Sequence, residues 1–342
     1  MEIRQIIITG ERQVELSKLE LDEKMIGKNE LLIDTEYTFV SAGTELANYT
    51  AQDPNVFKPG MWCSYPWKAG YANVGRVHAI GAEVSGFSIG QRVFSYGPHA
   101  SAFRYDLERM SVEVPDDIQP GIAAASRMAG VALGALPTMG ARDDPWVVVF
   151  GLGIVGNITA QSFGIRGYRV IGVDPVATRR ELAMACGVSY VVGGGEPDDV
   201  QATIEMITAE ELAGVCVDAV GHSAVIGQAL RATAPYGSLM LLGTPRVAIQ
   251  GNITEMWTDI HMRMITVRGA LEWDLPMYPD IGGRVSQQSK QNMIFDWIRR
   301  GKLQIEPLIS HCMRPAQIRD VYDGLLNHKD EYTGVLLDWR EG

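Results

Sequence analysis

Three glycines between an apolar strand and a helix form the strongest chemical signal in the chain. Residues 147–150 read VVVF and precede Gly151, Gly153 and Gly156 in the spacing G-x-G-x-x-G, and a second apolar run then ends at Asp174. The first glycine permits a tight turn, the second lets the backbone approach a pyrophosphate, and the third lets the helix lie close on the sheet. Free N–H groups at the helix start then face the phosphates. The motif predicts a dinucleotide-binding site; the alternative is a chance glycine-rich connection.

Asp174 bears on which dinucleotide binds. A carboxylate there accepts hydrogen bonds from the ribose hydroxyls and repels a 2'-phosphate, so NAD is expected ahead of NADP. Arg179 and Arg180 follow closely, and a guanidinium there could pair with a 2'-phosphate, which leaves NADP as the alternative. The other residues expected to bind the cofactor are Ile154, Val155, Val220, Gly243, Thr244 and Gly269.

Length, charge and cysteine usage limit the kind of protein. The chain has 342 residues, more than a single core usually serves, so two domains are expected. Its 30 basic and 41 acidic residues give a formal charge of −11 with no basic run, which argues against nucleic acid or an anionic membrane surface as a partner. Four scattered cysteines suggest neither a disulfide framework nor a zinc knuckle, and no leader or long apolar segment is evident. A cytoplasmic protein acting on a small molecule is expected.

The elements that carry these motifs fall into two patterns. Residues 3–115 contain short β-type runs separated by turn residues, and an alanine-rich helical stretch follows at 119–139. Strands and helices then alternate, which is typical of an α/β fold with a doubly wound parallel sheet of about six strands. The remaining part, from residue 287, is expected to rejoin the first module. The predicted domains are 1–118 with 274–342, for substrate and catalysis, and 119–273, for the dinucleotide.

Three phrases spread along the chain resemble the medium-chain dehydrogenase/reductase family, the alcohol dehydrogenase-like proteins. They are GAEVSGFSIGQRV (81–93), DAVGHSAVIGQALRATAPYGSLMLLG (218–243) and GKLQIEPLISHCM (301–313), the first with Gln91 where the family has an acid. The resemblance implies a β-rich GroES-like catalytic domain joined to a Rossmann domain, and NAD(P)-dependent dehydrogenase or reductase activity. It also implies a homodimer paired through the dinucleotide sheet, near residues 237–249 and 264–271.

The chain departs from the zinc-dependent members of the family it resembles. Ala42 stands where they have a ligating cysteine, Tyr71 and Ala72 stand where they have His-Glu, and Arg127 lies near the expected third ligand. The four-cysteine lobe expected between about 89 and 112 is also missing. Because zinc in such a site needs three protein ligands, no zinc is expected; the alternative is that unrelated residues rebuild a metal site.

Without zinc, hydrogen-bond donors must stabilise charge on the substrate oxygen. The expected catalytic residues are Thr44, Tyr71 and Tyr49. The family resemblance implies that Thr44 contacts the substrate oxygen, with capping of the next helix as its alternative role, and Tyr71 either exchanges a proton or only fills the vacated site. The residues expected to bind substrate are Glu45, Trp62, Trp67 and Arg127, although a Glu45–Arg127 ion pair is the favoured role for the arginine and a packed loop explains the tryptophans equally well.

The phrases VSAGTELANYT (40–50) and AGYANVGRV (69–77) resemble metal-free relatives that include bacteriochlorophyllide hydroxyethyl dehydrogenase-like proteins. That resemblance implies oxidation of a secondary alcohol, or reduction of its ketone, on an apolar and fairly bulky substrate. Reduction of a conjugated enone or quinone is an alternative, because hydride then adds at carbon and the oxygen needs only modest hydrogen bonding. A non-catalytic dinucleotide-binding sensor is the third hypothesis.

Overall fold

The computed structural model describes residues 1–136, 146–279, 282 and 285–340, and it divides into two compact units. Unit 1 contains Met1–Arg127, Leu275–Arg300 and Leu308–Gly342, and unit 2 contains Met128–Asp274 and Gly301–Pro307. The division differs from the expected one at two segments. Residues 119–127 belong to unit 1, because the helix there packs on unit 1 strands, and residues 301–307 belong to unit 2, because the backbone of Gln304 bonds to Gln161.

Unit 2 is built on a parallel sheet that has six strands among the described residues, in the order β11-β10-β9-β12-β13-β14. The order runs outward in both directions from β9, so the sheet is doubly wound as expected. The central strand β9 reads WVVVF and every residue in it is buried, which is typical of a parallel strand covered on both faces. The strands are β9 (Trp146–Phe150), β10 (Arg169–Asp174), β11 (Tyr190–Gly193), β12 (Ala213–Asp218), β13 (Thr233–Leu241) and β14 (Thr266–Gly269).

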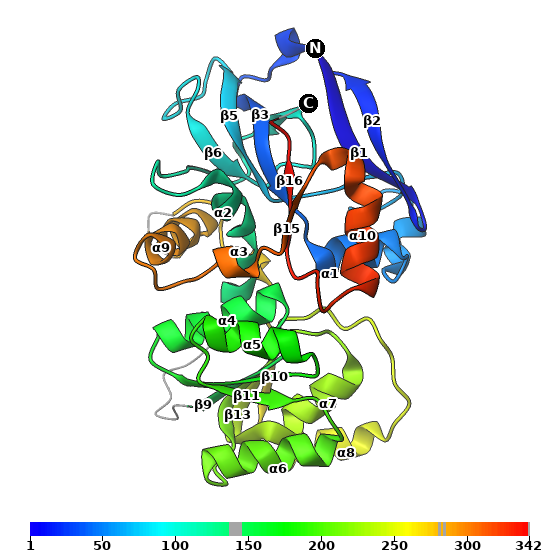
Figure 1. Cartoon of the computed structure of the whole chain (residues 1–342), viewed down its shortest axis with the longest axis vertical. Coiled ribbons are helices and arrows are strands. Elements are labelled where there is room, and N and C mark those ends of the chain that lie inside the picture. The colour runs from blue at the N-terminus through cyan, green and yellow to red at the C-terminus, as the bar shows by residue number, and fades with distance from the viewer. Residues whose placement is uncertain (137–145, 280–281, 283–284, 341–342) are drawn as a thin grey trace. The chain divides into compact units, whose positions relative to one another are not determined.

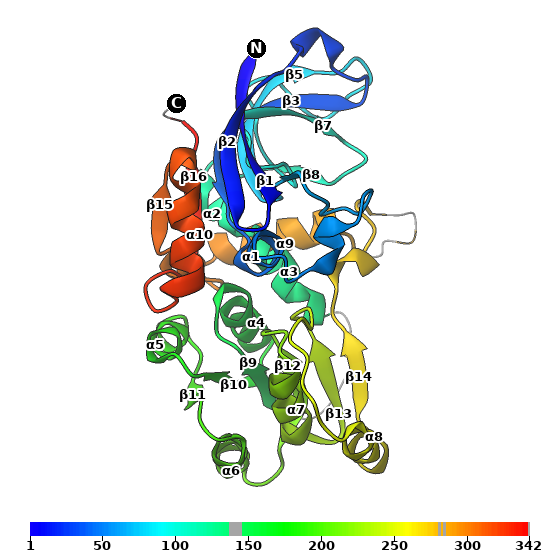
Figure 2. The same ribbon diagram turned by 90° about the vertical axis from the view of Figure 1, so that its right-hand side faces the viewer.

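Helices cover both faces of this sheet (Figure 2). Side chains of α4 and α5, such as Phe163 and Ala183, pack on one face, and side chains of α6 and α7, such as Ile204 and Leu230, pack on the other. Each of the large apolar side chains buried in this way contributes about 1.5–3 kcal/mol to folding. The helices are α4 (Ile154–Ile165), α5 (Ala177–Ala185), α6 (Pro197–Thr208), α7 (Ser223–Ala232) and α8 (Ile253–Met262).

Unit 1 is the β-rich module that the first third of the sequence predicts (Figure 1). Its described residues form a three-stranded sheet, β2-β1-β4, and a seven-stranded sheet, β15-β16-β3-β5-β6-β8 with β7 also paired to β3. The strands β15 and β16 come from the end of the chain, and β16 pairs with β3 of the first module. The strands are β1 (Glu2–Gly10), β2 (Gln13–Glu20), β3 (Glu30–Phe39), β4 (Trp67–Lys68), β5 (Asn73–Ile80), β6 (Arg92–Ser95), β7 (Ala102–Asp106), β8 (Ser111–Glu113), β15 (His311–Met313) and β16 (Val335–Asp338).

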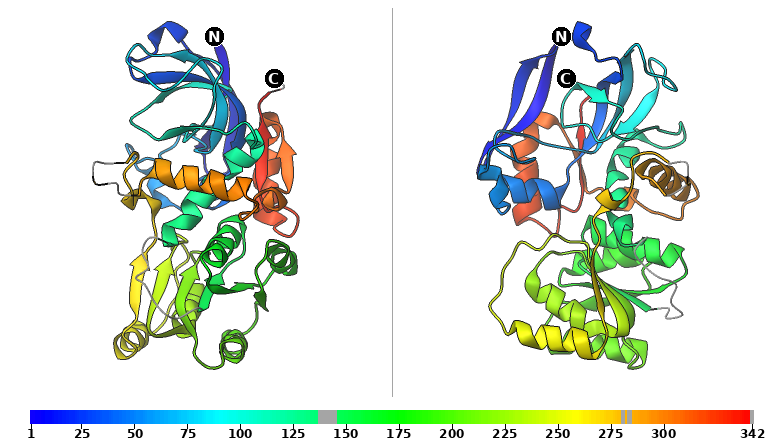
Figure 3. Two further views of the ribbon diagram at one scale, coloured as in Figure 1. Left: turned by 90° about the vertical axis from the view of Figure 1, so that its left-hand side faces the viewer. Right: turned by 180° about the vertical axis from the view of Figure 1, so that it is seen from behind.

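Few helices accompany these sheets. The amphipathic helix α10, near the red end of the colour scale, lies beside the blue strands β1 and β2 (Figure 3), and Ile6, Val14 and Val321 share one apolar cluster there. The stretch expected to be helical over 119–139 is broken at Ser126 into α2 and α3, and its last residues lie outside the described part of the chain. The helices are α1 (Ala42–Tyr49), α2 (Pro120–Ala125), α9 (Gln287–Arg299) and α10 (Ile318–Asn327), and α3 (Arg127–Ala132) passes from unit 1 into unit 2.

Among the helices of the described residues, none has both the length and the apolar character that crossing a lipid bilayer requires.

Candidate functional site

The glycine turn of unit 2 connects β9 to α4. Gly151 has a φ of +88°, which only glycine adopts without strain, and its N–H bonds to the Val173 carbonyl at 2.7 Å. A Cβ on Gly156 would lie 1.7 Å from the Gly151 oxygen, so only glycine lets the helix approach the turn. Gly153 is the N-cap of α4, no side chain caps the helix, and a Cβ there would meet nothing within 4 Å. The turn therefore leaves helix N–H groups open to an anion.

Asp174 ends β10, the strand next to the glycine turn, and its carboxylate is held by the backbone. One oxygen accepts the Leu152 N–H at 2.7 Å and the other accepts the Val176 N–H at 2.8 Å. The Arg179 guanidinium lies 3.8 Å from the first oxygen, while Arg180 donates to the Asp174 and Pro175 carbonyls. Asp174 is thus locked in place directly beside the turn.

A second buried acid, which the sequence analysis missed, organises the other side of the turn. Asp218 ends β12 and accepts hydrogen bonds from Val220 and Gly221 N–H groups at 3.1–3.2 Å, and burial raises its pKa despite these bonds. Val220 remains half exposed and lies over Gly151. The sequence signal that could have identified Asp218 is an acidic residue directly after an apolar strand, as in VCVDAVG.

Of the remaining expected cofactor residues, Ile154 and Val155 begin α4, and Gly243, Thr244 and Gly269 lie at the carboxyl ends of successive strands. Gly243 follows β13 and packs against the backbone of Val220, closely enough that a Cβ would lie 2.4 Å from the Gly221 nitrogen. Thr244 follows it and is exposed, and Gly269 ends β14. In parallel sheets of this type, ligands bind outside the carboxyl ends of the strands where the strand order reverses.

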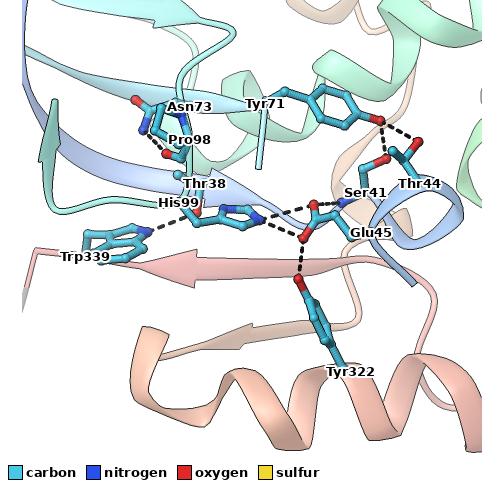
Figure 4. Close-up of polar contacts among 10 residues, drawn as sticks. All are labelled: Thr38, Ser41, Thr44, Glu45, Tyr71, Asn73, Pro98, His99, Tyr322 and Trp339. Carbon is cyan, nitrogen blue, oxygen red and sulfur yellow. Dashed lines mark hydrogen bonds and ion pairs between the residues drawn. The ribbon is translucent and has the colours of Figure 1, made fainter. Parts of the chain in front are cut away.

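Three hydroxyl groups converge in unit 1, where β3 leads into α1 (Figure 4). Ser41 is the N-cap of α1, and its hydroxyl makes a short hydrogen bond with the Tyr71 phenol. The same phenol donates to the Thr44 hydroxyl at 3.2 Å. The structure thus brings together two of the predicted catalytic residues, Thr44 and Tyr71. It adds Ser41, which the sequence could have indicated by its position directly before a helix.

The phenol is also next to a buried cation. The Arg127 guanidinium is 1% exposed and lies 4.9 Å from the centre of the Tyr71 ring and 4.4 Å from that of Tyr96. Burial raises the pKa of Tyr71, whereas the Arg127 charge and the hydrogen bonds with Ser41 and Thr44 act to lower it; the net direction is upward. At neutral pH the phenol is therefore protonated and can donate a hydrogen bond.

Glu45 is not available to a ligand. Its side chain is fully buried, and its carboxylate accepts the Ser41 N–H at 2.7 Å, the Tyr322 hydroxyl at 2.8 Å and the His99 Nε2 at 3.0 Å. The carboxylate makes no ion pair with Arg127, so the favoured pairing of these two residues was wrong. The reason is tertiary: two of the three donors, His99 and Tyr322, come from segments 54 and 277 positions away in the sequence.

The other expected site residues lie apart from the hydroxyl cluster. Tyr49, at the end of α1, packs on Tyr322 with ring centres 5.0 Å apart. Trp67 is buried in β4 where it pairs with Ile8 of β1, and Trp62 stands edge-on to it at 5.7 Å with 56% of its surface exposed. Trp67 therefore anchors the loop, and Trp62 presents an aromatic face to solvent.

Comparisons with known proteins agree with this architecture. Residues 151–281 match the family model described as "Zinc-binding dehydrogenase". The chain is 24% identical over 343 residues to D-guloside 3-dehydrogenase of Escherichia coli (strain K12), covering 94% of this chain and 95% of that protein, and 24% identical to L-threonine 3-dehydrogenase of Chromobacterium violaceum, covering 96% of each. Among solved structures, galactitol-1-phosphate dehydrogenase from Escherichia coli superposes with a TM-score of 0.80 at 17% identity, covering 98% of this chain and 99% of that one.

The chain is thus similar, along nearly its whole length, to proteins named as dehydrogenases. Unit 2 has the Rossmann-like fold of alcohol dehydrogenase-like structures and unit 1 their GroES-like fold, as the sequence predicts. The glycine turn before α4 fits the dinucleotide of an NAD(P)-dependent oxidoreductase, because it combines a close backbone approach with uncapped helix N–H groups.

Since the matching family model is described as zinc-binding, the fit of this chain to the metal matters. At the three positions where the resemblance places the zinc ligands, Ala42 has no side-chain donor, Arg127 carries a positive charge, and the Tyr71 phenol is bonded to hydroxyls. Among the described residues, no group of three or more His, Cys, Asp or Glu side chains is arranged to hold a metal. The described side chains do not fit a catalytic zinc ion in this place.

Proposed function

We propose that the protein is a medium-chain dehydrogenase that interconverts a secondary alcohol and its ketone with NAD(H) and without zinc. The observation that carries the proposal is the convergence of the Ser41, Thr44 and Tyr71 hydroxyls in unit 1, next to the buried Arg127 charge. The bound nicotinamide would supply the hydride chemistry. The protein must then bind the substrate oxygen and move its proton.

The hydroxyl cluster is suited to that proton movement. Tyr71 can donate a hydrogen bond to a carbonyl oxygen. In the direction of oxidation it can take the proton of an alcohol while its own proton moves to the Thr44 oxygen and the partly exposed Thr44 hydroxyl releases its proton to solvent. The Arg127 guanidinium over the phenol ring stabilises the negative charge that develops during this exchange. A fixed cation and hydroxyls of this kind can do for the oxygen what a Lewis-acid metal does in relatives.

The preference for NAD rests on Asp174. Its carboxylate is immobilised beside the glycine turn by Leu152 and Val176, and a fixed negative charge there disfavours a 2'-phosphate. Arg179, which lies 3.8 Å from that carboxylate, partly offsets the repulsion. The dissociation constants of NAD and NADP, measured by calorimetry, test the preference; tighter binding of NADP contradicts it.

The proposed substrate is a bulky molecule with an apolar face. Trp62, exposed at the edge of Trp67, supports this, because an aromatic face binds flat apolar surface. The two relatives described above are named for a guloside and an amino acid, so glycosides and hydroxyamino acids belong in the same panel as hydrophobic secondary alcohols. Turnover of any secondary alcohol with NAD supports the reaction class; reduction of enones or quinones alone supports the alternative.

Zinc independence is tested on the active protein itself. Purified enzyme is dialysed against a strong chelator, and its metal content and turnover are measured before and after. Unchanged turnover with less than stoichiometric zinc supports the proposal. Loss of turnover on chelation, restored by zinc, contradicts it.

We also propose a homodimer formed through the open edge of the Rossmann sheet. The strand β14 pairs with β13 on one side, and its described residues are exposed. Val267, Leu271 and Trp273 on and after this strand are 40%, 64% and 58% exposed, which is unusual for a free sheet edge. Light scattering gives the mass in solution; Leu271→Glu should produce monomers, whereas Met206→Glu on α6 should not.

A further inference from the structure

The Tyr71 hydroxyl cluster is backed by a second, fully buried polar network that has no access to a substrate. Its centre is the Glu45 carboxylate, and its outer members are His99, from the loop after β6, and Tyr322, from α10. All three side chains are 0% exposed. Burying a carboxylate costs free energy unless hydrogen bonds compensate for the lost water. The convergence of several donors on one buried carboxylate in this unit therefore calls for an explanation.

Both segments that carry the reactive hydroxyls are tied to this network. On one side, Glu45 accepts the backbone N–H of Ser41, which fixes the N-terminus of α1 and so the direction of the Ser41 and Thr44 side chains (Figure 4). On the other side, His99 packs on Gly70, the residue before Tyr71. A Cβ on Gly70, whose φ is +93°, would lie 2.5 Å from the His99 backbone nitrogen and 2.6 Å from Cγ of the His99 ring. The imidazole therefore lies directly against the backbone of the residue that precedes Tyr71.

The position of His99 is itself strongly determined. Its backbone N–H bonds to the Ala69 carbonyl at 2.8 Å, and its carbonyl accepts from Ile6 of β1 at 2.9 Å. The preceding carbonyl, of Pro98, accepts from the buried Asn73 amide at 3.2 Å. Among the described residues, Glu45 is the one hydrogen-bond partner of the imidazole ring, since Nδ1 has none. The Nε2 proton is thus directed at the carboxylate.

We propose that the buried network of Glu45, His99 and Tyr322 is a positioning element that holds the Ser41 and Thr44 hydroxyls against the Tyr71 phenol. The inference rests on the catalytic role proposed for that phenol. Glu45 locks α1, His99 links Glu45 to the Gly70–Tyr71 backbone, and Tyr322 completes the donor set of the carboxylate. None of the three touches the substrate, so they are positioning residues.

The network has an electrostatic consequence that a purely structural role would lack. The charged groups that face the phenol are Arg127 and Glu45: the arginine lowers the pKa of Tyr71 and the carboxylate raises it. The hydrogen bonds from Ser41 and Thr44 also lower the pKa of Tyr71. If a donor to Glu45 is lost, the cluster loosens and the carboxylate charge is less neutralised. Both changes move the titration of Tyr71 to higher pH.

The test compares two isosteric tyrosine variants of the full chain. Tyr322→Phe removes one donor to Glu45 and keeps the ring that packs on Tyr49. The control is Tyr332→Phe, because Tyr332 packs against the same apolar cluster and its hydroxyl bonds to no residue in the described part of the chain. The titration of Tyr71 is followed by phenolate absorbance, as the difference between each protein and the same protein carrying Tyr71→Phe. This measurement needs no substrate.

Tyr322→Phe should move the Tyr71 titration to higher pH and lower kcat by about tenfold, while the KM for the dinucleotide stays within about twofold. Tyr332→Phe should change none of these. His99→Leu, if folded, should act in the same direction and more strongly, and His99→Gln should largely restore the parent behaviour because its amide can donate to Glu45. A Tyr322→Phe protein with lower thermal stability but an unmoved Tyr71 titration overturns the proposal, and so does a control that moves equally. If the parent turns over no alcohol, the proposed function fails, yet the titration still decides whether the network positions the phenol.

Discussion

The glycine turn allows a prediction in which three glycine-to-alanine changes separate cofactor binding from folding. Gly153 and Gly164 both belong to the α4 region, and at both sites a Cβ would meet nothing within 4 Å. At Gly156 the Cβ would lie 1.7 Å from the Gly151 oxygen and 2.8 Å from its carbonyl carbon, and these are backbone atoms that cannot rotate away. Three outcomes follow from these differences.

Gly153→Ala should weaken NAD binding with little effect on folding. Its φ of −59° suits alanine, so the folded state loses no more than about 1 kcal/mol of N-cap preference. The methyl group, however, occupies the open space in front of the helix N–H groups. Hydrogen bonds to a charged group are worth about 1.5–3 kcal/mol each, so loss of one raises Kd by about tenfold to a hundredfold.

Gly164→Ala is the matched control on the same helix. Alanine is about 1 kcal/mol better than glycine in a helix interior, so this variant should melt slightly higher and bind NAD normally. Gly156→Ala should lose both properties, because overpacking against backbone costs about 1–3 kcal/mol or more and displaces the turn. Calorimetric titration with NAD and thermal unfolding give the two readouts. Normal NAD affinity in Gly153→Ala would refute the assignment of this turn to the dinucleotide.

Three further predictions concern single side chains. Asp174→Asn removes the charge next to the turn and should reduce the ratio of NADP to NAD dissociation constants by about tenfold; an unchanged ratio argues against its role. Tyr71→Phe should lower kcat by about 10²–10⁴-fold without unfolding the protein, and unimpaired turnover removes the phenol from catalysis. Glu36 lies 3.1 Å from Arg76 and 2.6 Å from Arg92; burial alone would raise the pKa of Glu36, but the two arginines hold it below its ordinary value. A carboxylate whose pKa is lower in the folded state than in the unfolded state stabilises the fold at pH values above the unfolded-state pKa, and this stabilisation is lost as the pH falls through the folded-state pKa. Glu36→Gln should therefore lower the free energy of unfolding by about 1 kcal/mol at pH 7. In urea titrations at lower pH, the difference between variant and parent should vanish as Glu36 becomes protonated.

Much of the Rossmann domain could be predicted from the sequence. Its strands are continuous apolar runs such as 147–150, its helices alternate with them, and the glycine spacing that begins at Gly151 is local to one turn. The six-stranded doubly wound sheet follows from that alternation and is confirmed. The strand ends that carry Asp174 and Asp218 were equally visible, although the second was overlooked.

The domain boundaries were harder to predict because they depend on packing rather than on local pattern. The alanine-rich segment 119–127 reads as the beginning of a helical layer over the second domain, yet α2 packs on β3, β5 and β16 of the first. Gln304 lies within a phrase that the resemblance assigns to the C-terminal return. Its backbone N–H and carbonyl nevertheless both form hydrogen bonds with the side chain of Gln161 in α4. Hydrogen bonds between segments more than a hundred residues apart leave no periodic trace in the sequence.

By itself, the sequence determined the two-part architecture and the glycine turn, because both depend on residue types at short spacings, and it is the basis for the proposal that Ala42, Tyr71 and Arg127 stand in place of metal ligands. Only the tertiary structure decided what surrounds the tyrosine. Glu45, which the sequence offered as a substrate ligand or a partner of Arg127, is sealed among donors from Ser41, His99 and Tyr322. Partners separated by 54 and 277 positions meet only when two sheets and a C-terminal helix pack together, since burial and hydrogen-bond pairing are properties of the assembled core and not of any single segment.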